Sequence, residues 1–352
     1  MDRKKVFVGL SGGVDSSVAA LRLKKQGYEV VGVFIKVWHP DFLVCNWEQE
    51  RLDAMRVAAH LDIPFLTCDA EAAYRDEVAK YFISEYAAGR TPNPDVMCNK
   101  YVKFGAFINF AKEKGADFIA TGHYAQKVVT ENSIELHRGI DNNKDQSYFL
   151  WSLTTGQLNY SLLPVGDTNK EKIRQEAAAA GIPTATKKDS QGVCFLGHIN
   201  IKEFLSHYID LTIGDVLNES GKVIGKHEGA FIYTVGQRHG FTIFTQSEKR
   251  EVYYVIAKDV ENNTITVGVN HPILKKKNGL VLENLTLRTP VVAGEEYEAQ
   301  TRYRQEPFSV RVIRVTKDKV ELEILDETEA VADGQSCVLY LGSLCLGGGI
   351  IT

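Results

Sequence analysis

The sequence predicts an α/β protein: a doubly wound parallel-sheet domain at the N-terminus, followed by two small β domains, the last a β-barrel. Three observations favour this fold class. The length of 352 residues is too great for one ordinary core. Strand-like and helix-like segments alternate up to about residue 200, and the segments beyond it are short and rich in β-formers. We expect domains over residues 1–200, 201–272 and 273–352.

The first part of the chain alternates regularly between two kinds of segment. Apolar runs predict strands, and longer stretches with helical spacing of apolar residues predict helices. The expected strands are 5–10, 29–35, 64–67 and 116–123. The expected helices are 16–28, 51–63, 71–89 and 170–183. This alternation is typical of βαβ units with helices on both faces of a parallel sheet.

Beyond about residue 200 the predicted segments are β-rich and separated by Gly, Asn and Asp. They cover 229–241, 251–269, 279–287, 296–304, 308–316, 319–325 and 337–342. ENNT (261–264) and TKDK (316–319) lie where hairpin turns belong. We place the boundary between the two β domains within 271–279.

Composition narrows the class of protein. Hydrophobic residues make up 44% of the chain and charged residues 24%, which is typical of a globular protein. The start MDRKKVFVGL leads directly into a strand and leaves no room for a targeting peptide, so we expect a cytoplasmic protein. The net charge of −4 gives no general signature of nucleic-acid binding, although a local basic face can still bind RNA.

The segment VGLSGGVDSS (8–17) is a candidate phosphate-binding loop between the first strand and the first helix. Its glycines permit tight turns, and backbone N–H groups at a helix start bind anions. The Walker A pattern needs a lysine that this loop lacks. The loop carries Asp15 instead, and an acid beside phosphates implies Mg²⁺ between them. The alternative is a plain Gly-rich turn.

The pattern SGGxDS within this loop resembles the hallmark of the PP-loop ATP pyrophosphatases. The resemblance implies that ATP is cleaved between its α and β phosphates, which leaves an adenylated substrate and pyrophosphate. GMP, argininosuccinate and asparagine synthetases share the motif with several tRNA-modifying enzymes, so it does not define the substrate. ATGHYA (120–125) ends a later strand at the same carboxyl edge, where ligands bind in open α/β sheets.

Two of the six cysteines differ from the others in their surroundings. No CxxC pair is present, which argues against a zinc site and against a disulfide framework. Cys98 follows TPNPD, which predicts a polar turn stiffened by prolines, and Cys194 lies in the polar loop KDSQGVCFLG. The remaining four lie in apolar runs typical of buried thiols, at positions 45, 68, 337 and 345.

Paired cysteines beside an adenylating loop have a chemical use. When ATP turns a carbonyl oxygen into a leaving group, sulfur can replace it. One cysteine can deliver the terminal sulfur of a persulfide, and a second thiolate can release that sulfur by thiol exchange, leaving a disulfide. Asp95, three residues before Cys98, is a candidate proton acceptor.

Motifs along nearly the whole chain resemble the bacterial tRNA-specific 2-thiouridylases. They are GLSGGVDSSVAA (9–20), AGRTPNPDVMCNKYVKF (88–104), ATGHYAQ (120–126), KDQSYFL (144–150), DSQGVCFLG (189–197), YTVGQRHGF (233–241), TRYRQEP (301–307) and LCLGGGIIT (344–352). NPDxxCN together with SGGxDS is highly specific to that family. The resemblance implies thiolation of C2 of the wobble uridine in tRNA, with ATP and Mg²⁺ as cofactors.

The resemblance also implies roles for individual residues: Cys98 as nucleophile, Cys194 as persulfide carrier and Asp15 as metal ligand. The implied nucleotide-binding residues are Gly9, Leu10, Ser11, Gly12, Gly13, Val14, Asp15, Ser16, Ile35 and Gly122. Ile35 replaces the family's usual methionine, and a branched aliphatic still packs on adenine. The implied tRNA contacts are Asn93, Pro94, Asp95, His123, Lys144, Asp145, Gln146, Arg302, Tyr303 and Gln335.

The expected partners are a tRNA with a wobble uridine and a persulfide sulfur donor, either a cysteine desulfurase or a relay protein. Two forms of the sulfur step stay open, because Cys98 can also free hydrogen sulfide, which then attacks. Two other functions stay open as well: a ligase of the argininosuccinate synthetase type, and a non-catalytic tRNA-binding protein. On sequence alone, His123 also fits a core-edge histidine, and 144–146 also fits a plain turn.

Overall fold

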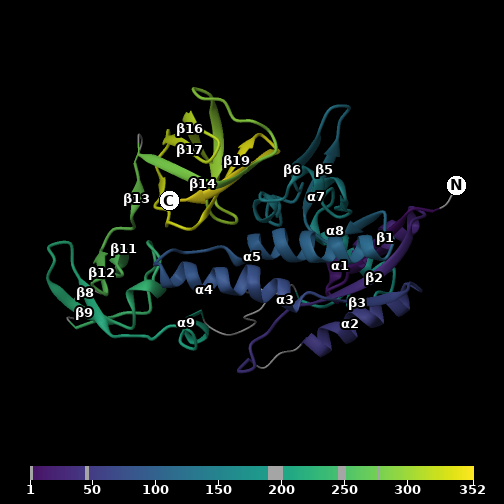
Figure 1. The fold of residues 1–352 in the computed structure, drawn as a ribbon, viewed down its shortest axis with the longest axis horizontal. Coiled ribbons are helices and arrows are strands. Elements are labelled where there is room, and N and C mark those ends of the chain that lie inside the picture. Colours follow the sequence, from purple (N-terminus) through teal and green to yellow (C-terminus); the bar gives the residue numbers. More distant parts are fainter. Residues whose placement is uncertain (1–2, 44–46, 189–200, 245–250, 276–277) are drawn as a thin grey trace.

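The N-terminal domain is built on a fully parallel sheet with helices on both faces (Figure 1). The computed structural model describes residues 3–43, 47–188, 201–244, 251–275 and 278–352. The strand order is β3-β2-β1-β4-β7, so the order reverses between β1 and β4. Ligands bind at such switch points, at the carboxyl ends of the strands. The doubly wound fold that the sequence predicts is confirmed.

The elements of this domain follow the expected alternation. The strands are β1 Lys5–Gly9, β2 Glu29–Lys36, β3 Phe65–Asp69, β4 Phe118–Ala120 and β7 Ser161–Leu162. The helices are α1 Val14–Lys25, α2 Trp47–His60, α3 Glu71–Tyr74, α4 Lys80–Ala87, α5 Pro94–Met97, α6 Phe107–Glu113, α7 Thr155–Asn159 and α8 Lys170–Ala179. A single 3₁₀ turn, Ser147–Leu150, precedes α7.

Alternate residues of β1 belong to two different cores. Val6 and Val8 pack with α1, α2 and α8 on one face of the sheet. Phe7 packs with α3 to α6 on the other face. Successive side chains of a strand point to opposite faces, so one apolar strand serves both layers. The second core continues into the C-terminal domain through Val338 and Tyr340.

Two helical runs on that second face contain π-helical segments. The expected helix 71–89 is present as a continuous helical run over 71–87, in which the π-helical segment Arg75–Ala79 lies between α3 and α4. A second run, α5 to α6, contains the π-helical segment Cys98–Ala106 and was not predicted as a helix. Such segments within helices are frequent at functional sites.

The C-terminal domain is a closed barrel, as predicted. Its strands are β14 Gly279–Leu287, β15 Glu296–Gln300, β16 Phe308–Val315, β17 Val320–Ile324, β19 Ser336–Leu341 and β20 Leu344–Ile351, closed by pairing of β14 with β20. A hairpin that belongs to the N-terminal domain by sequence, β5 Ala125–Val129 and β6 Ile134–Arg138, adds to this sheet. Leu344 of β20 pairs with His137 of β6. This hairpin was not among the predicted elements.

The central domain is a small sheet in the order β10-β9-β8-β12-β11. Its strands are β8 Gly214–Leu217, β9 Val223–His227, β10 Thr242–Ile243, β11 Tyr254–Asp259 and β12 Thr264–Gly268. The helix α9 Ile201–Leu205 precedes this sheet in the chain. After the sheet, β13 Ile273–Leu274 pairs with β18 Thr328–Glu329. The expected β segment 229–241 is wrong, since it begins with the 3₁₀ turn Ala230–Ile232 and continues in turns. Both predicted hairpin turns are present.

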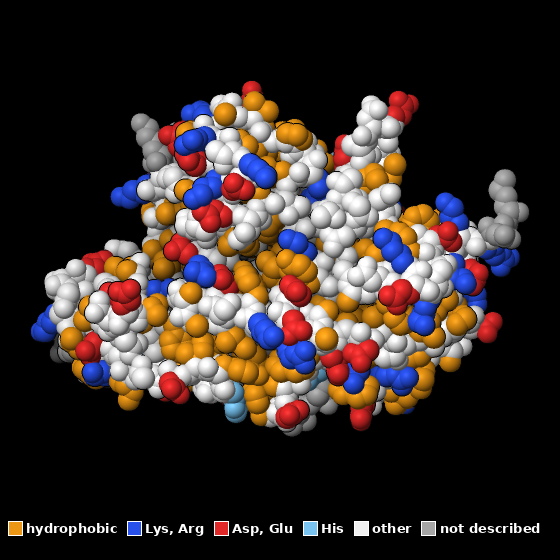
Figure 2. All heavy atoms as spheres, viewed as in Figure 1, with side chains coloured by type: hydrophobic (Ala, Val, Ile, Leu, Met, Phe, Trp, Pro, Cys, Tyr) orange, Lys and Arg blue, Asp and Glu red, His pale blue; other side chains and the backbone are white. Residues whose placement is uncertain are grey.

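The surface carries both signs of charge close together. Figure 2 shows Lys and Arg interspersed with Asp and Glu over the visible face, with apolar side chains between the barrel and the helices below it. Within the described residues, no helix is both long and apolar enough to span a bilayer.

Candidate active site

The predicted phosphate loop connects β1 to α1 at the carboxyl edge of the sheet. The Leu10 N–H donates to the Val33 carbonyl of β2 at 2.8 Å, which fixes the loop to the neighbouring strand. Gly12 has a φ of +70°, a conformation that a side chain would strain. Gly13 precedes α1 in an extended conformation and provides no side-chain cap. The first N–H groups of α1 are therefore suited to an anion.

Two glycines allow other segments to approach this loop through their backbones. A Cβ on Gly12 would lie 2.7 Å from Cβ of Asp53 on α2. A Cβ on Gly122, just after β4, would lie 2.6 Å from the backbone nitrogen of Ser16. Gly122 thus contacts the first turn of α1 directly. Ile35 lies near the start of the loop. Its Cδ1 is 3.5 Å from the position that a Cβ on Gly9 would occupy.

Asp15 is held by two residues distant in sequence. The Lys170 ammonium lies 2.7 and 2.8 Å from the two carboxylate oxygens, and the Tyr124 hydroxyl donates to Oδ1 at 2.6 Å. A carboxylate offers about four lone-pair sites, so these bonds leave one for a further ligand. Within the described ranges, no group of three or more His, Cys, Asp or Glu is placed to hold a metal. Asp15 can therefore supply one metal ligand but not a protein cage.

Cys98 lies at a helix rather than on a polar loop, so that expectation is wrong. Asn93 caps α5 by accepting a hydrogen bond from Val96 N at 3.3 Å, and Pro94 occupies the first turn. Proline suits this position because its missing N–H would have no partner there. The proline-rich segment thus starts a helix instead of ending in a stiff turn.

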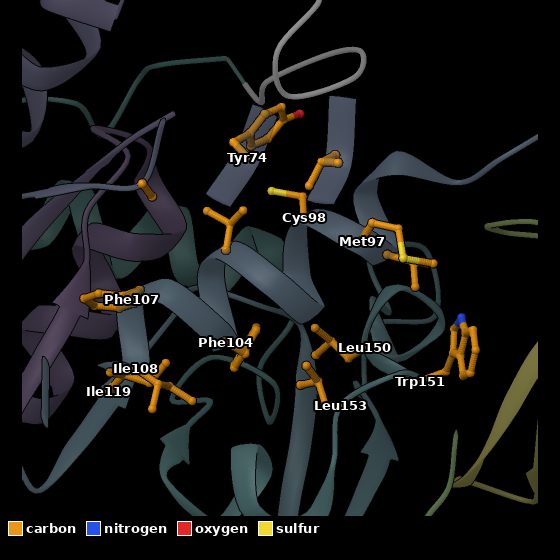
Figure 3. Close-up of a cluster of buried hydrophobic side chains, with 14 of the residues drawn as sticks. Tyr74, Met97, Cys98, Phe104, Phe107, Ile108, Ile119, Leu150, Trp151 and Leu153 are labelled. Carbon is orange, nitrogen blue, oxygen red and sulfur yellow. The ribbon is translucent and has the colours of Figure 1, made fainter. Parts of the chain in front are cut away.

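The Cys98 thiol is buried in the core between the sheet and the helices. It is 2% exposed and lies beside Tyr74 (Figure 3). Asp95 and Asn93, on the preceding turn, are half-buried. Burial also holds for the other described cysteines, as expected, and raises the pKa of Cys68 and of Cys337 to about 12. These two thiols stay protonated at neutral pH.

All three domains meet at the residues before Cys98. Thr91 N donates to the carbonyl of Asp333, near the end of the barrel, at 2.8 Å. The Thr91 hydroxyl lies 3.0 Å from that of Thr234 in the central domain. A Cβ on Gly89 would lie 2.4 Å from Cγ2 of Val260, also in the central domain. The start of the Cys98 helix is therefore fixed by both β domains.

Cys194 and its loop lie outside the described residues, so its distance from Cys98 stays untested. The chain just before this segment is anchored beside the phosphate loop. Lys187 lies with its Nζ 2.8 Å from Oδ2 of Asp53, the residue that packs against Gly12. The carbonyl of Lys187 also accepts a hydrogen bond from Arg174 at 3.1 Å.

The predicted tRNA contacts near β4 and in the 144–146 loop are tied into the protein. His123 is buried, and its Nδ1 lies 2.8 Å from the Thr121 hydroxyl. Burial, with a smaller effect of Lys103, lowers the pKa of His123 well below its usual value, so the ring is neutral at physiological pH. Asp145 is buried and accepts four hydrogen bonds that hold its own loop. A role in tRNA binding stays a prediction for these positions.

Gln146 joins that loop to the phosphate site. Its side-chain oxygen accepts from Tyr124 N at 3.0 Å, and its own N–H donates to the Tyr124 carbonyl at 2.8 Å. Tyr124 in turn binds Asp15. Lys144, at the edge of the same loop, is half-buried. A single residue, Tyr124, therefore connects the 144–146 loop to the phosphate loop by hydrogen bonds.

The predicted contacts in the barrel lie on its face toward the N-terminal domain. Arg302 pairs with Glu329 at 2.7 Å, and the Tyr303 ring lies 4.7 Å from that of Phe149. The expected strand 296–304 ends at Gln300, so both side chains belong to a turn. Gln335 accepts a 3.5 Å hydrogen bond from Ala332 N within the 332–335 turn.

Sequence reasoning missed two residues of the site, Lys170 and Tyr124. Lys170 is 155 positions from Asp15, and the sequence around it predicts only that it begins an ordinary surface helix. Tyr124 follows the predicted strand end and reads as a core aromatic. Only the fold brings them to the loop, so no local pattern could have found them.

Three family models match consecutive parts of the chain. They describe a tRNA methyl transferase HUP domain over residues 4–198, a tRNA methyl transferase PRC-barrel domain over 202–269 and an aminomethyltransferase beta-barrel domain over 282–351. Curated relatives from Listeria innocua and Enterococcus faecalis are each 44% identical, and one from Streptococcus thermophilus is 45% identical. Each alignment covers 99% of this chain and 94 or 95% of the relative, and each relative is named tRNA-specific 2-thiouridylase MnmA.

The chain belongs to the tRNA-specific 2-thiouridylase family. This membership confirms the resemblance found in the sequence and argues against the ligase alternative. Two solved structures that match the chain are more distant in sequence. A 4-thiouridine synthetase–RNA complex with bound ATP aligns at a TM-score of 0.39 and 22% identity, over 58% of this chain and 50% of that one. The NMN synthetase of Francisella tularensis aligns at 0.34 and 17%, over 53% and 66%.

Proposed function

We propose that this chain catalyses the ATP-dependent replacement of the C2 oxygen of the wobble uridine in tRNA by sulfur. Family membership supports the substrate and the reaction. One observation of the structure carries the proposal: the helix that bears Asp95 and Cys98 starts where all three domains meet, and it shares its core with Ile35 at the phosphate loop. An RNA held by the β domains would thus approach a thiol and a phosphate site together.

The first step is adenylation of the uridine. The N–H groups of residues 9–16 would bind the phosphates of ATP, and Ile35 would pack on the adenine. The uridine O2 attacks the α-phosphorus, the bond to the bridging β-phosphate oxygen breaks, and pyrophosphate leaves. Asp95 is proposed to accept the N3 proton as O2 attacks. Mg²⁺ would be held by Asp15 and the phosphates and would neutralise part of their charge.

The second step transfers sulfur. The terminal sulfur of a persulfide on Cys194 attacks C2, and AMP leaves with the former O2. The Cys98 thiolate then attacks the Cys194 sulfur, and the persulfide S–S bond breaks. The transferred sulfur stays on C2, the two cysteines form a disulfide, and an external thiol reductant supplies two electrons to restore them. In the variant of this step, Cys98 first frees hydrogen sulfide, which attacks C2.

The structure sets one requirement on this scheme. Since Cys98 is 2% exposed, the helix start must open when the substrate binds. The proposed tRNA contacts are Asn93, Pro94, Asp95, His123, Lys144, Asp145, Gln146, Arg302, Tyr303 and Gln335. A cytoplasmic cysteine desulfurase or sulfur relay protein is the proposed donor that loads Cys194.

Mass spectrometry of tRNA nucleosides tests the proposal, after reaction with Mg-ATP and a persulfide donor. Cys98→Ser and Cys194→Ser should each abolish 2-thiouridine while tRNA-dependent pyrophosphate release continues. Cys68→Ala is the matched control, because Cys68 is buried on β3 and has no role in the scheme. Near-normal 2-thiouridine with either serine variant would refute the two-cysteine mechanism. A wild-type enzyme that releases no pyrophosphate with any tRNA would refute the proposed function.

A further inference from the structure

The helical run that carries Cys98 contains a turn that is wider than an α-helical turn. The N–H of Phe107 donates to the carbonyl of Val102, five residues back, where an α-helix would use a carbonyl four residues back. With this wide turn, Cys98 and Val102 are buried in the same core as Phe107. An ordinary turn in its place would rotate Cys98 by one residue's step, about 100°, relative to the residues that follow the turn.

One side chain from another helix holds this wide turn. The Gln157 Nε2 group on α7 donates to the carbonyl of Lys100 at 2.9 Å and to that of Phe104 at 2.8 Å. Both carbonyls lie within the π-helical segment Cys98–Ala106 and are four residues apart in the sequence. Because one amide group binds both, it fixes the spacing between two successive turns of the segment that begins at Cys98.

The cap of α7 does not explain why this residue is a glutamine. The cap uses only the side-chain oxygen of Gln157, which accepts from the Thr154 N–H at 2.9 Å and from the Thr154 hydroxyl at 3.1 Å. Glutamate occupies this position of a capping box as well as glutamine does. Only the contact with the π-helical segment needs the two N–H groups of the amide.

A second amide binds the start of the same segment to the same part of the chain. Asn99 is buried, and its Nδ2 donates to the carbonyl of Phe149 at 3.1 Å. Phe149 lies in the 3₁₀ turn Ser147–Leu150, which precedes α7. Residues 147–157 therefore hold the π-helical segment at two places, directly after the 144–146 loop that is proposed to contact tRNA.

We propose that Gln157 is a positioning residue for the sulfur-transfer step, because it holds the wide turn that sets the direction of the Cys98 thiol. Its two hydrogen bonds keep this turn from relaxing to α-helical geometry. A misdirected thiol lowers the rate of its attack on the Cys194 persulfide, whereas the substrates are bound by other residues and keep their affinity. This inference rests on the proposed function, in which Cys98 makes that attack.

Alkylation of the cysteines in the full-length protein, without substrates, tests the geometry apart from catalysis. Gln157→Glu keeps the oxygen that caps α7 and removes both donors to the π-helical segment. Mass spectrometry after iodoacetamide treatment should show Cys98 labelled at least about tenfold faster than in the wild type. Cys68, which is buried on β3, is the internal control and should stay protected within about twofold. Thr154→Ala weakens the cap but keeps both donors of Gln157, so Cys98 should stay protected.

Single-turnover thiolation of tRNA by the persulfide-loaded enzyme separates rate from affinity. At saturating Mg-ATP and tRNA, Gln157→Glu should lower the rate of 2-thiouridine formation at least about tenfold. Its dissociation constants for ATP and for tRNA should stay within about twofold of the wild-type values. Thr154→Ala should keep at least about half of the wild-type rate.

Three results for Gln157→Glu would each overturn the proposal: wild-type protection of Cys98, a wild-type rate of thiolation, or effects equal to those of Thr154→Ala. Should the new carboxylate repel the two carbonyls so strongly that Cys68 is labelled too, Gln157→Met replaces this variant, since methionine is uncharged. Selective exposure of Cys98 is again expected, and its absence would overturn the proposal. A wild-type protein that forms no 2-thiouridine would instead refute the proposed function, while the alkylation experiment would still decide whether Gln157 holds Cys98.

Discussion

Gly122 sets the distance between the end of β4 and the phosphate loop. Its own backbone lies so close to Ser16 and Asp15 that a methyl group has no room: the added Cβ would lie 2.6 Å from Ser16 N and 2.8 Å from the Asp15 carbonyl carbon. Both atoms are backbone, so neither can rotate away. A one-carbon change would displace the loop rather than a side chain.

We expect Gly122→Ala to reduce tRNA-dependent pyrophosphate release at least about a hundredfold, because a loop displaced by about 1 Å loses its alignment. Gly156→Ala is the control. Gly156 is exposed in α7, and the nearest atom to its added Cβ is 4.0 Å away. Alanine also suits a helix better than glycine does. A wild-type rate for Gly122→Ala would contradict this account of the loop.

At the start of α5 the sequence predicts a turn, whereas the structure contains a capped helix. Asn93 and Pro94 are turn formers in a sequence scan, but they are equally good residues for a helix cap and its first turn. Sequence patterns could not decide between the two uses. In the structure Asn93 caps α5, and the residues after it, Val96, Met97 and Cys98, are buried in the core.

The two roles of Asn93, helix cap and proposed uridine contact, are separable. Asn93→Ala should lower the free energy of unfolding by about 1 kcal/mol, because Val96 N loses its acceptor. Asn93→Asp keeps an oxygen acceptor and should keep the stability. If Asn93 also contacts the uridine through its amide, both variants should reduce thiolation. Denaturant unfolding and nucleoside mass spectrometry measure the two effects, and full activity of Asn93→Asp would limit Asn93 to capping.

At the scale of the whole molecule, the barrel is joined to the N-terminal domain by polar bonds as well as by the shared core. Arg288 at the end of β14 donates to the carbonyls of Trp151 and Leu153, at 2.6 and 2.8 Å, and to that of Cys345 at 3.0 Å. The hairpin β5–β6 extends the barrel sheet from the other side. The two domains are therefore expected to unfold together.

We expect Arg288→Met to lower the thermal midpoint by at least about 3 °C, since three partly buried carbonyls lose their donor. Arg314→Met is the control, because Arg314 is exposed on the barrel and lies 3.9 Å from Glu321. Its midpoint should stay within about 1 °C. Differential scanning calorimetry measures both variants, and equal midpoints would show that the Arg288 hydrogen bonds do not help to join the domains.

The sequence predicted the architecture well because each domain has local signals for it. Strand and helix periodicity led to the doubly wound sheet, and ENNT and TKDK to the hairpins. The hairpin β5–β6 was not predicted, and its place in the barrel sheet depends on pairing with β20, more than 200 positions away. The phosphate loop could be predicted because its residues are consecutive in the sequence. Lys170 was missed because it lies 155 positions from Asp15.

The chain of bonds from Gln146 through Tyr124 to Asp15 has a consequence for how the affinities for ATP and for tRNA depend on each other. If residues 144–146 contact tRNA as proposed, the same two bonds are strained or relaxed by either ligand. Thermodynamic reciprocity then requires that ATP changes the affinity for tRNA by the factor by which tRNA changes the affinity for ATP. If that factor exceeds one, the complex that holds both substrates is favoured over either complex that holds one.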